Sequence, residues 1–150
     1  MKTNVFVSVP ALMCFVFTCL VFIGCEKQDA DTTKPVISLS EPEEGEEVRT
    51  GESMHLEMDL SDDVALAGYM VEVHNNFDHH GHKAPARAAE DSVVFYFKQS
   101  YEISGRNQHI HSHDVVIPAN AKAGDYHLMV YCTDAAGNQS FVARNIVLSP

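Results

Sequence analysis

Histidine is the residue of this sequence whose number and placement could do chemistry. The chain has 150 residues and nine histidines, against ten lysines and arginines together. Neutral imidazole is the commonest side-chain ligand for zinc, copper and nickel, and three or four such ligands close a coordination shell. All but His55 occupy three places in the sequence: His74 with His79, His80 and His82; His109, His111 and His113; and His127.

The elements that must position these histidines are predicted to be strands. From Pro35 to Pro150 apolar and polar residues alternate, with turn residues between the alternating runs and no helical stripe. Seven or so short strands in this length predict an all-β fold, an immunoglobulin-like antiparallel β-sandwich. Tyr126 begins one strand and is expected to hold the preceding corner through its hydroxyl. The expected strands lie near residues 36–39, 54–60, 69–74, 93–103, 109–117, 126–132 and 142–150.

Strand alternation predicts where two of the histidines point. Val71 and Val73 face the core, so His74 faces outward at the end of its strand, and Leu128 likewise turns His127 outward at the start of another. In immunoglobulin topology these two strands are antiparallel neighbours, and directly opposite side chains have Cβ atoms about 4.5–5.5 Å apart. We therefore predict that His74 and His127 lie side by side.

Three further histidines follow in the next loop. His79, His80 and His82 begin five residues after His74, and Gly81 between them allows the backbone to bend around a centre. We predict that these three bind a transition metal, zinc or copper, together with His74 and His127. The alternative is a solvated polar patch with no ion.

His109, His111 and His113 form a second group. Alternation on a strand places all three on one face, about 6.6 Å apart per pair, so that two could share one ion. Their strand belongs to the opposite sheet, and only His113 lies near enough to its end to join the His74 end. We include His111 and His113 among the candidate ligands. His109 and His111 could instead form a separate site or face solvent, and all three could lie on a loop if the strand starts later. His55 is predicted to be an ordinary surface residue.

Oxygen ligands suggest a different cation at the other end of the sandwich. Asp62, Asp63, Asp134 and Asn138 are predicted to lie in two neighbouring loops, and oxygen ligands suit calcium. Residues of these types more often form Asx turns beside a hairpin, and this is the favoured interpretation. Calcium is thus the alternative to zinc or copper.

The sequence gives no support for an enzyme or a nucleic-acid-binding protein. It contains no Gly-x-Ser-x-Gly, no phosphate-binding glycine loop and no His-Glu-x-x-His. Cys132 falls on the inward parity of its strand, where a thiol is packed and inert. The formal net charge of −11 lacks the basic face that nucleic acid requires.

The N-terminal segment is predicted to be a targeting signal. Lys2 precedes an apolar run from Val5 to Ile23, and the run ends in Phe22-Ile23-Gly24-Cys25, which resembles a bacterial lipobox. This resemblance implies a signal peptide over residues 1–24, lipidation of Cys25, an acidic tether over 25–34 and a folded domain over 35–150. The alternative is an uncleaved anchor helix.

A wider resemblance covers residues 35–150. The segment from Tyr126 to Asn138 resembles the penultimate strand and hairpin of bacterial immunoglobulin-like domains. With residues 77–82 and 124–127, the chain resembles an uncharacterised family of small immunoglobulin-like envelope lipoproteins. That family implies fold and location but no activity.

Two functions remain open at this point. The first is a lipid-anchored protein of the bacterial cell envelope, on the periplasmic or surface face of the outer membrane, that binds a metal through its histidines. The second is a structural or adhesion module that binds a protein or glycan partner without metal.

Overall fold

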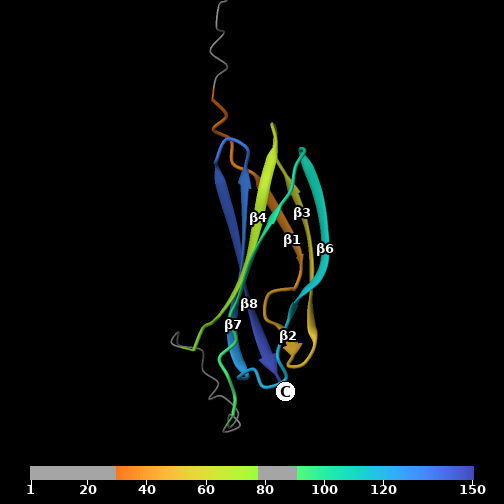
Figure 1. Cartoon of the computed structure of the whole chain (residues 1–150), viewed down its shortest axis with the longest axis vertical. Helices are drawn as coiled ribbons and strands as arrows, with labels where there is room; N and C mark the ends of the chain where they lie inside the picture. Colours follow the sequence, from red (N-terminus) through yellow and green to blue (C-terminus); the bar gives the residue numbers. More distant parts are fainter. Residues whose placement is uncertain (1–29, 78–90) are drawn as a thin grey trace, which may run out of the picture.

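The computed structural model of the chain describes residues 30–77 and 91–150, which form two packed β-sheets (Figure 1). The predicted signal peptide and Cys25 lie outside these ranges. No helix in the described part of the chain is long and apolar enough to cross a membrane. The strands within it are β1 (Val36–Glu41), β2 (Glu46–Arg49), β3 (Ser53–Ser61), β4 (Leu66–Asn75), β5 (Phe97–Glu102), β6 (Asn107–Val116), β7 (Gly124–Asp134) and β8 (Gln139–Ser149).

The two sheets differ in size and contain almost only antiparallel pairs. One has the order β1-β3-β6, and the other has the order β2-β8-β7-β4-β5. The predicted all-β sandwich is confirmed, and so is the placement of β4 beside β7 in one sheet with β6 in the other. Neighbouring β4, β7 and β8 correspond to the C, F and G strands of an immunoglobulin sheet.

Two details of the strand prediction were wrong. The short strand β2 was missed because Val48 is its one buried residue, flanked by charged residues, and it pairs in parallel with β8 rather than antiparallel. The strand expected from Val93 begins only at Phe97, since Val93 makes a single isolated bridge to Ala121. Neither change moves a histidine.

The core lies between the sheets and follows the period of two. On β3 the residues facing the core are almost fully buried, while His55 and Glu57 between them are partly exposed. On β7 the same alternation buries one face and turns the other, including His127, outward. Fully burying one such apolar side chain is worth about 1.5–3 kcal/mol, which fixes the register of both strands. The buried apolar residues of these two strands are Met54, Leu56, Met58, Leu60, Tyr126, Leu128, Val130 and Cys132.

Tyr126 ties three segments together at one end of the sandwich. Its ring is fully buried, and its hydroxyl donates to the Lys122 carbonyl at 2.8 Å and accepts the Phe95 N–H at 3.2 Å. The expected corner contact is thus confirmed. The second bond also holds the segment before β5 against the β6–β7 loop.

Replacing Tyr126 by Phe should destabilise the fold without changing its shape. The Phe95 N–H and the Lys122 carbonyl would lose their partner, and a buried unpaired group costs about 1–3 kcal/mol. Urea unfolding followed by circular dichroism measures this loss. The control is Tyr131→Phe on the outer face of β7, which should stay within about 0.5 kcal/mol of the parent. Equal stabilities for Tyr126→Phe and the parent would contradict the role of the hydroxyl.

Cys132 should resist alkylation while the protein is folded. Its side chain is fully buried, and burial, followed by the charges of Asp62 and Asp134, raises the pKa of its thiol to about 11. At pH 8 only about one thiol in a thousand would then be ionised. Iodoacetamide should leave the Cys132 peptide unmodified in buffer and modify it fully in urea, as measured by mass spectrometry. Rapid native labelling would place this thiol outside the core.

Candidate metal centre

His74 and His127 lie side by side, as the sequence predicted. They are direct cross-strand partners on β4 and β7, with ring centroids 5.5 Å apart and planes at 89°. His74 Nδ1 is buried and lies 3.5 Å from Glu72 Oε1, and the same carboxylate holds Lys98 Nζ at 3.0 Å. Of the five ligands predicted at this end, these two fall within the described residues. His79, His80 and His82 lie outside them.

His111 and His113 do not join that pair. Strand β6 belongs to the three-stranded sheet, so its outward side chains lie on the opposite face of the sandwich from those of β4 and β7. The expectation that His113 could reach the His74 end was therefore wrong. His113 does lie toward the correct end of the sandwich, but the whole core separates it from His127.

Three imidazoles gather instead on the outer face of β3 and β6. His55 Nε2 lies 3.2 Å from His111 Nδ1. The rings of His55 and His113 are stacked, with centroids 4.9 Å apart and planes at 17°, and His113 meets His111 edge-on at 5.5 Å. One nitrogen from each of the three rings lies within 4.8 Å of the other two. We refer to His55, His111 and His113 as the three-histidine cluster.

Glu57 adds a carboxylate to this cluster. Its Oε2 lies 3.6 Å from His55 Nε2 and 3.7 Å from His111 Nδ1. These three atoms therefore form a triangle with edges of 3.2, 3.6 and 3.7 Å. Two ligand atoms that bind one tetrahedral zinc at about 2.0–2.1 Å are about 3.3 Å apart. The triangle is close to one face of such a tetrahedron, and His113 offers a further nitrogen within 4.8 Å of a nitrogen of His55 and of His111.

A β-bulge explains how His113 comes to lie against His55. Met54 pairs with Val115 and Leu56 pairs with Ser112, so one residue of β3 opposes two residues of β6. The two are His113 and Asp114, both exposed, and the Ser112 hydroxyl accepts the Asp114 N–H at 3.0 Å within the bulge. The bulge turns His113 outward beside His55 without displacing the buried Val115.

The side chains around the cluster are mostly acidic, and some of them already contact other side chains. His109 lies outside the cluster, because its Nδ1 contacts Asp59 Oδ1 at 2.9 Å. Glu41 lies near His55. A side-chain hydrogen bond with Glu46 raises the pKa of Glu41, and the charge of His55 acts to lower this pKa. The negative charge of these carboxylates favours a bound cation.

Sequence reasoning missed His55 and Glu57. The signal was present, because both alternate with buried residues and so face outward on the same strand. In an immunoglobulin sandwich the second and fifth strands of the basic seven are neighbours in one sheet. The same rule makes the strands at residues 54–60 and 109–117 neighbours. It therefore predicts that His55 lies beside His111 and His113.

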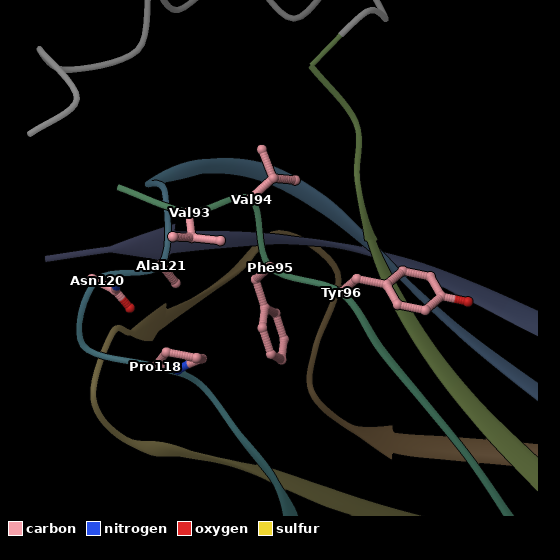
Figure 2. A pocket seen from close by; sticks show the side chains of 7 residues that line it. All are labelled: Val93, Val94, Phe95, Tyr96, Pro118, Asn120 and Ala121. Atoms are coloured by element: carbon pink, nitrogen blue, oxygen red, sulfur yellow. The ribbon is translucent and has the colours of Figure 1, made fainter. Parts of the chain in front are cut away.

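An apolar pocket among the described residues is another feature that could take a ligand. It has a volume of about 270 Å³ between the segment before β5 and the β6–β7 loop, and in Figure 2 Phe95 projects toward Pro118 while Tyr96 points away. Asn120 is the only amide among the residues that line it, and no pair of titratable groups converges there. The pocket therefore lacks the groups of an active site. Its lining comprises Val93, Val94, Phe95, Tyr96, Pro118, Asn120 and Ala121.

Comparison with known proteins gives a family but no activity. No curated protein matches the chain. A family described as a domain of unknown function (DUF4625) matches residues 23–149, which is most of the chain. The protein therefore belongs to the DUF4625 family.

Proposed function

We propose that this protein is a lipid-anchored component of the bacterial cell envelope that binds a transition-metal ion, zinc or copper, at the three-histidine cluster and Glu57. The observation that carries the proposal is the triangle of His55 Nε2, His111 Nδ1 and Glu57 Oε2, with edges of 3.2 to 3.7 Å. Borderline-soft nitrogen donors with one carboxylate suit zinc and copper better than magnesium or calcium.

The position of the cluster favours an ion that exchanges. His111 and His113 are exposed, and their strand β6 is an edge strand of its sheet. The hydrophobic core forms between the sheets and does not include the cluster. A structural zinc site is usually closed and contributes to folding, whereas this one lies on a fold that is already complete. Binding, storage or transfer of the ion is therefore the proposed role, rather than catalysis.

The envelope location rests on the sequence. Phe22-Ile23-Gly24-Cys25 has the pattern of a lipobox, with bulky, apolar and small residues before the cysteine. Lipidation of Cys25 would attach the domain to a membrane, with the acidic segment after it as the tether. The outer membrane is the proposed site, on its periplasmic or surface face.

A second candidate function is supported by the other sheet. Met70, Tyr131 and Phe141 form one cross-strand row on its outer face, and Phe141 is 64% exposed. The rings of Tyr131 and Phe141 have centroids 5.8 Å apart. Exposed aromatic pairs suit contact with a protein or a glycan. An adhesion module without metal is thus the alternative.

Metal titration of the full chain, purified in detergent without a histidine tag, tests the first proposal. We expect one zinc or copper ion per chain, measured by competition with a chromophoric chelator. Loss of a supporting group alone usually costs about 10–100-fold in metal affinity, so His111→Ala and His55→Ala should each cost at least about a hundredfold. Both replace half-buried or exposed side chains and should leave the unfolding curve almost unchanged.

Two variants serve as matched controls for that titration. His109→Ala removes a neighbouring imidazole on the same face, and it should bind the ion as the parent does. The double variant His74→Ala, His127→Ala should also keep the ion. If the double variant loses the ion while His111→Ala retains it, the centre lies at the His74 end and the present assignment is wrong.

Lipidation is tested separately by growth with labelled palmitate. The parent should incorporate label and partition into detergent, whereas Cys25→Ser should incorporate none because the acceptor thiol is gone. Cys132→Ala removes the buried thiol and should be labelled like the parent. Label retained in Cys25→Ser would place the lipid on another residue, and an unlabelled parent that still partitions into detergent would show that the apolar segment is an uncleaved anchor.

A further inference from the structure

A second cluster of ligand-type side chains lies where the chain enters the domain. Asp31 precedes β1, and Asp62 and Asp63 lie between β3 and β4. One carboxylate oxygen from each lies within 4.8 Å of the other two. In Figure 1 the orange segment that leads into β1 reaches this end of the sandwich beside the β7–β8 hairpin. We refer to these three residues as the aspartate cluster.

Asp62 is the residue that makes the cluster more than a group of surface acids. Its side chain is buried, with 9% of its surface exposed. Oδ1 accepts the N–H groups of Val64 and Ala65 at 2.9 and 2.8 Å, and Oδ2 is buried with no hydrogen-bond partner. A buried, unpartnered carboxylate oxygen is costly, and a bound cation is the group that would compensate it.

The charges nearby do not provide that compensation. Within the described residues, no lysine, arginine or histidine nitrogen forms an ion pair with a carboxylate of the cluster. Arg106, whose carbonyl accepts the Asp62 N–H at 2.8 Å, donates from Nε to the Val64 carbonyl instead. Asp134 beside the cluster is also buried. Burial alone would raise the pKa of Asp134, but hydrogen bonds from Asn138 and neighbouring backbone N–H groups lower it, so Asp134 adds further negative charge.

The geometry points to a calcium site formed by the carboxylates of Asp31, Asp62 and Asp63, which would hold the segment after the membrane anchor against the domain. Calcium takes six to eight oxygen ligands at about 2.3–2.6 Å, so two oxygens on one ion are at most about 5 Å apart. One oxygen of each carboxylate lies within 4.8 Å of the other two, so all three meet this condition at once. Water would supply the remaining ligands.

The surrounding contacts explain how Asp31 is brought to the site. Asn138 Nδ2 donates to the Asp31 carbonyl at 3.1 Å and to Asp134 Oδ2 at 2.7 Å. Thr33 Oγ1 donates to Asp63 Oδ2 at 3.3 Å. Asp134 and Asn138 form the expected turn, in which Asp134 Oδ1 accepts the Asn138 N–H at 2.8 Å. They position the entering segment, and Asp31 contributes the third carboxylate of the cluster.

Calcium titration of the full chain in detergent tests this site, with isothermal calorimetry as the readout. Extracellular calcium modules have Kd values of about 10⁻⁴–10⁻³ M, and we expect binding in that range with one ion per chain. Asp63→Asn and Asp31→Asn should each weaken binding about tenfold or more. The matched control is Asp125→Asn, which removes one charge at the opposite end and should bind calcium as the parent does.

A second readout separates a specific site from general attraction to an acidic protein. Calcium should slow amide hydrogen exchange in residues 31–34 of the parent and leave it unchanged in Asp31→Asn. His111→Ala should bind calcium normally, so this test is independent of the proposed transition-metal centre. No calcium heat, an equal loss in Asp125→Asn, or unchanged exchange at 31–34 in the parent would each overturn the proposal.

Discussion

The alternation of side chains across two packed sheets is the constraint on which the His74–His127 pair and the three-histidine cluster depend. The core buries Met54, Leu56 and Met58 of β3, so the side chains of the residues between them point outward. A slip of one residue would expose these apolar side chains and drive His55 and Glu57 into the core. The energy that fixes the histidines is therefore apolar burial, to which the histidines themselves contribute nothing.

How many of the histidine contacts could be predicted from the sequence depends on strand pairing across each sheet. The neighbourhood of His74 and His127 was predictable because each side chain's direction follows from its own strand and the two strands are adjacent in the expected topology. The same two steps apply to His55 and His111. They were missed because His55 stands alone in the sequence, and its partners lie more than fifty residues away.

Other features depend on interactions that no local pattern encodes. The bulge that places His113 beside His55 is a local mismatch between two strands, and it is visible only once both registers are known. Strand β2 contains a single buried residue and is stabilised by parallel pairing with the last strand of the fold. The role of Asp31 depends on a contact with Asn138, which lies on a hairpin at the other end of the sequence. Composition alone assigned Asp31 to a tether.

The chemistry of the donors separates the two proposed cations. Imidazole nitrogens bind zinc and copper strongly, and carboxylates without nitrogen partners suit calcium, so neither cluster should compete strongly for the other's ion. The three-histidine cluster lies on an outer sheet face, whereas the aspartate cluster lies where the chain enters β1. Calcium at the second site would restrict the entering segment and hence the orientation of the sheet face that carries the first. The first ion would remain open to exchange with solvent.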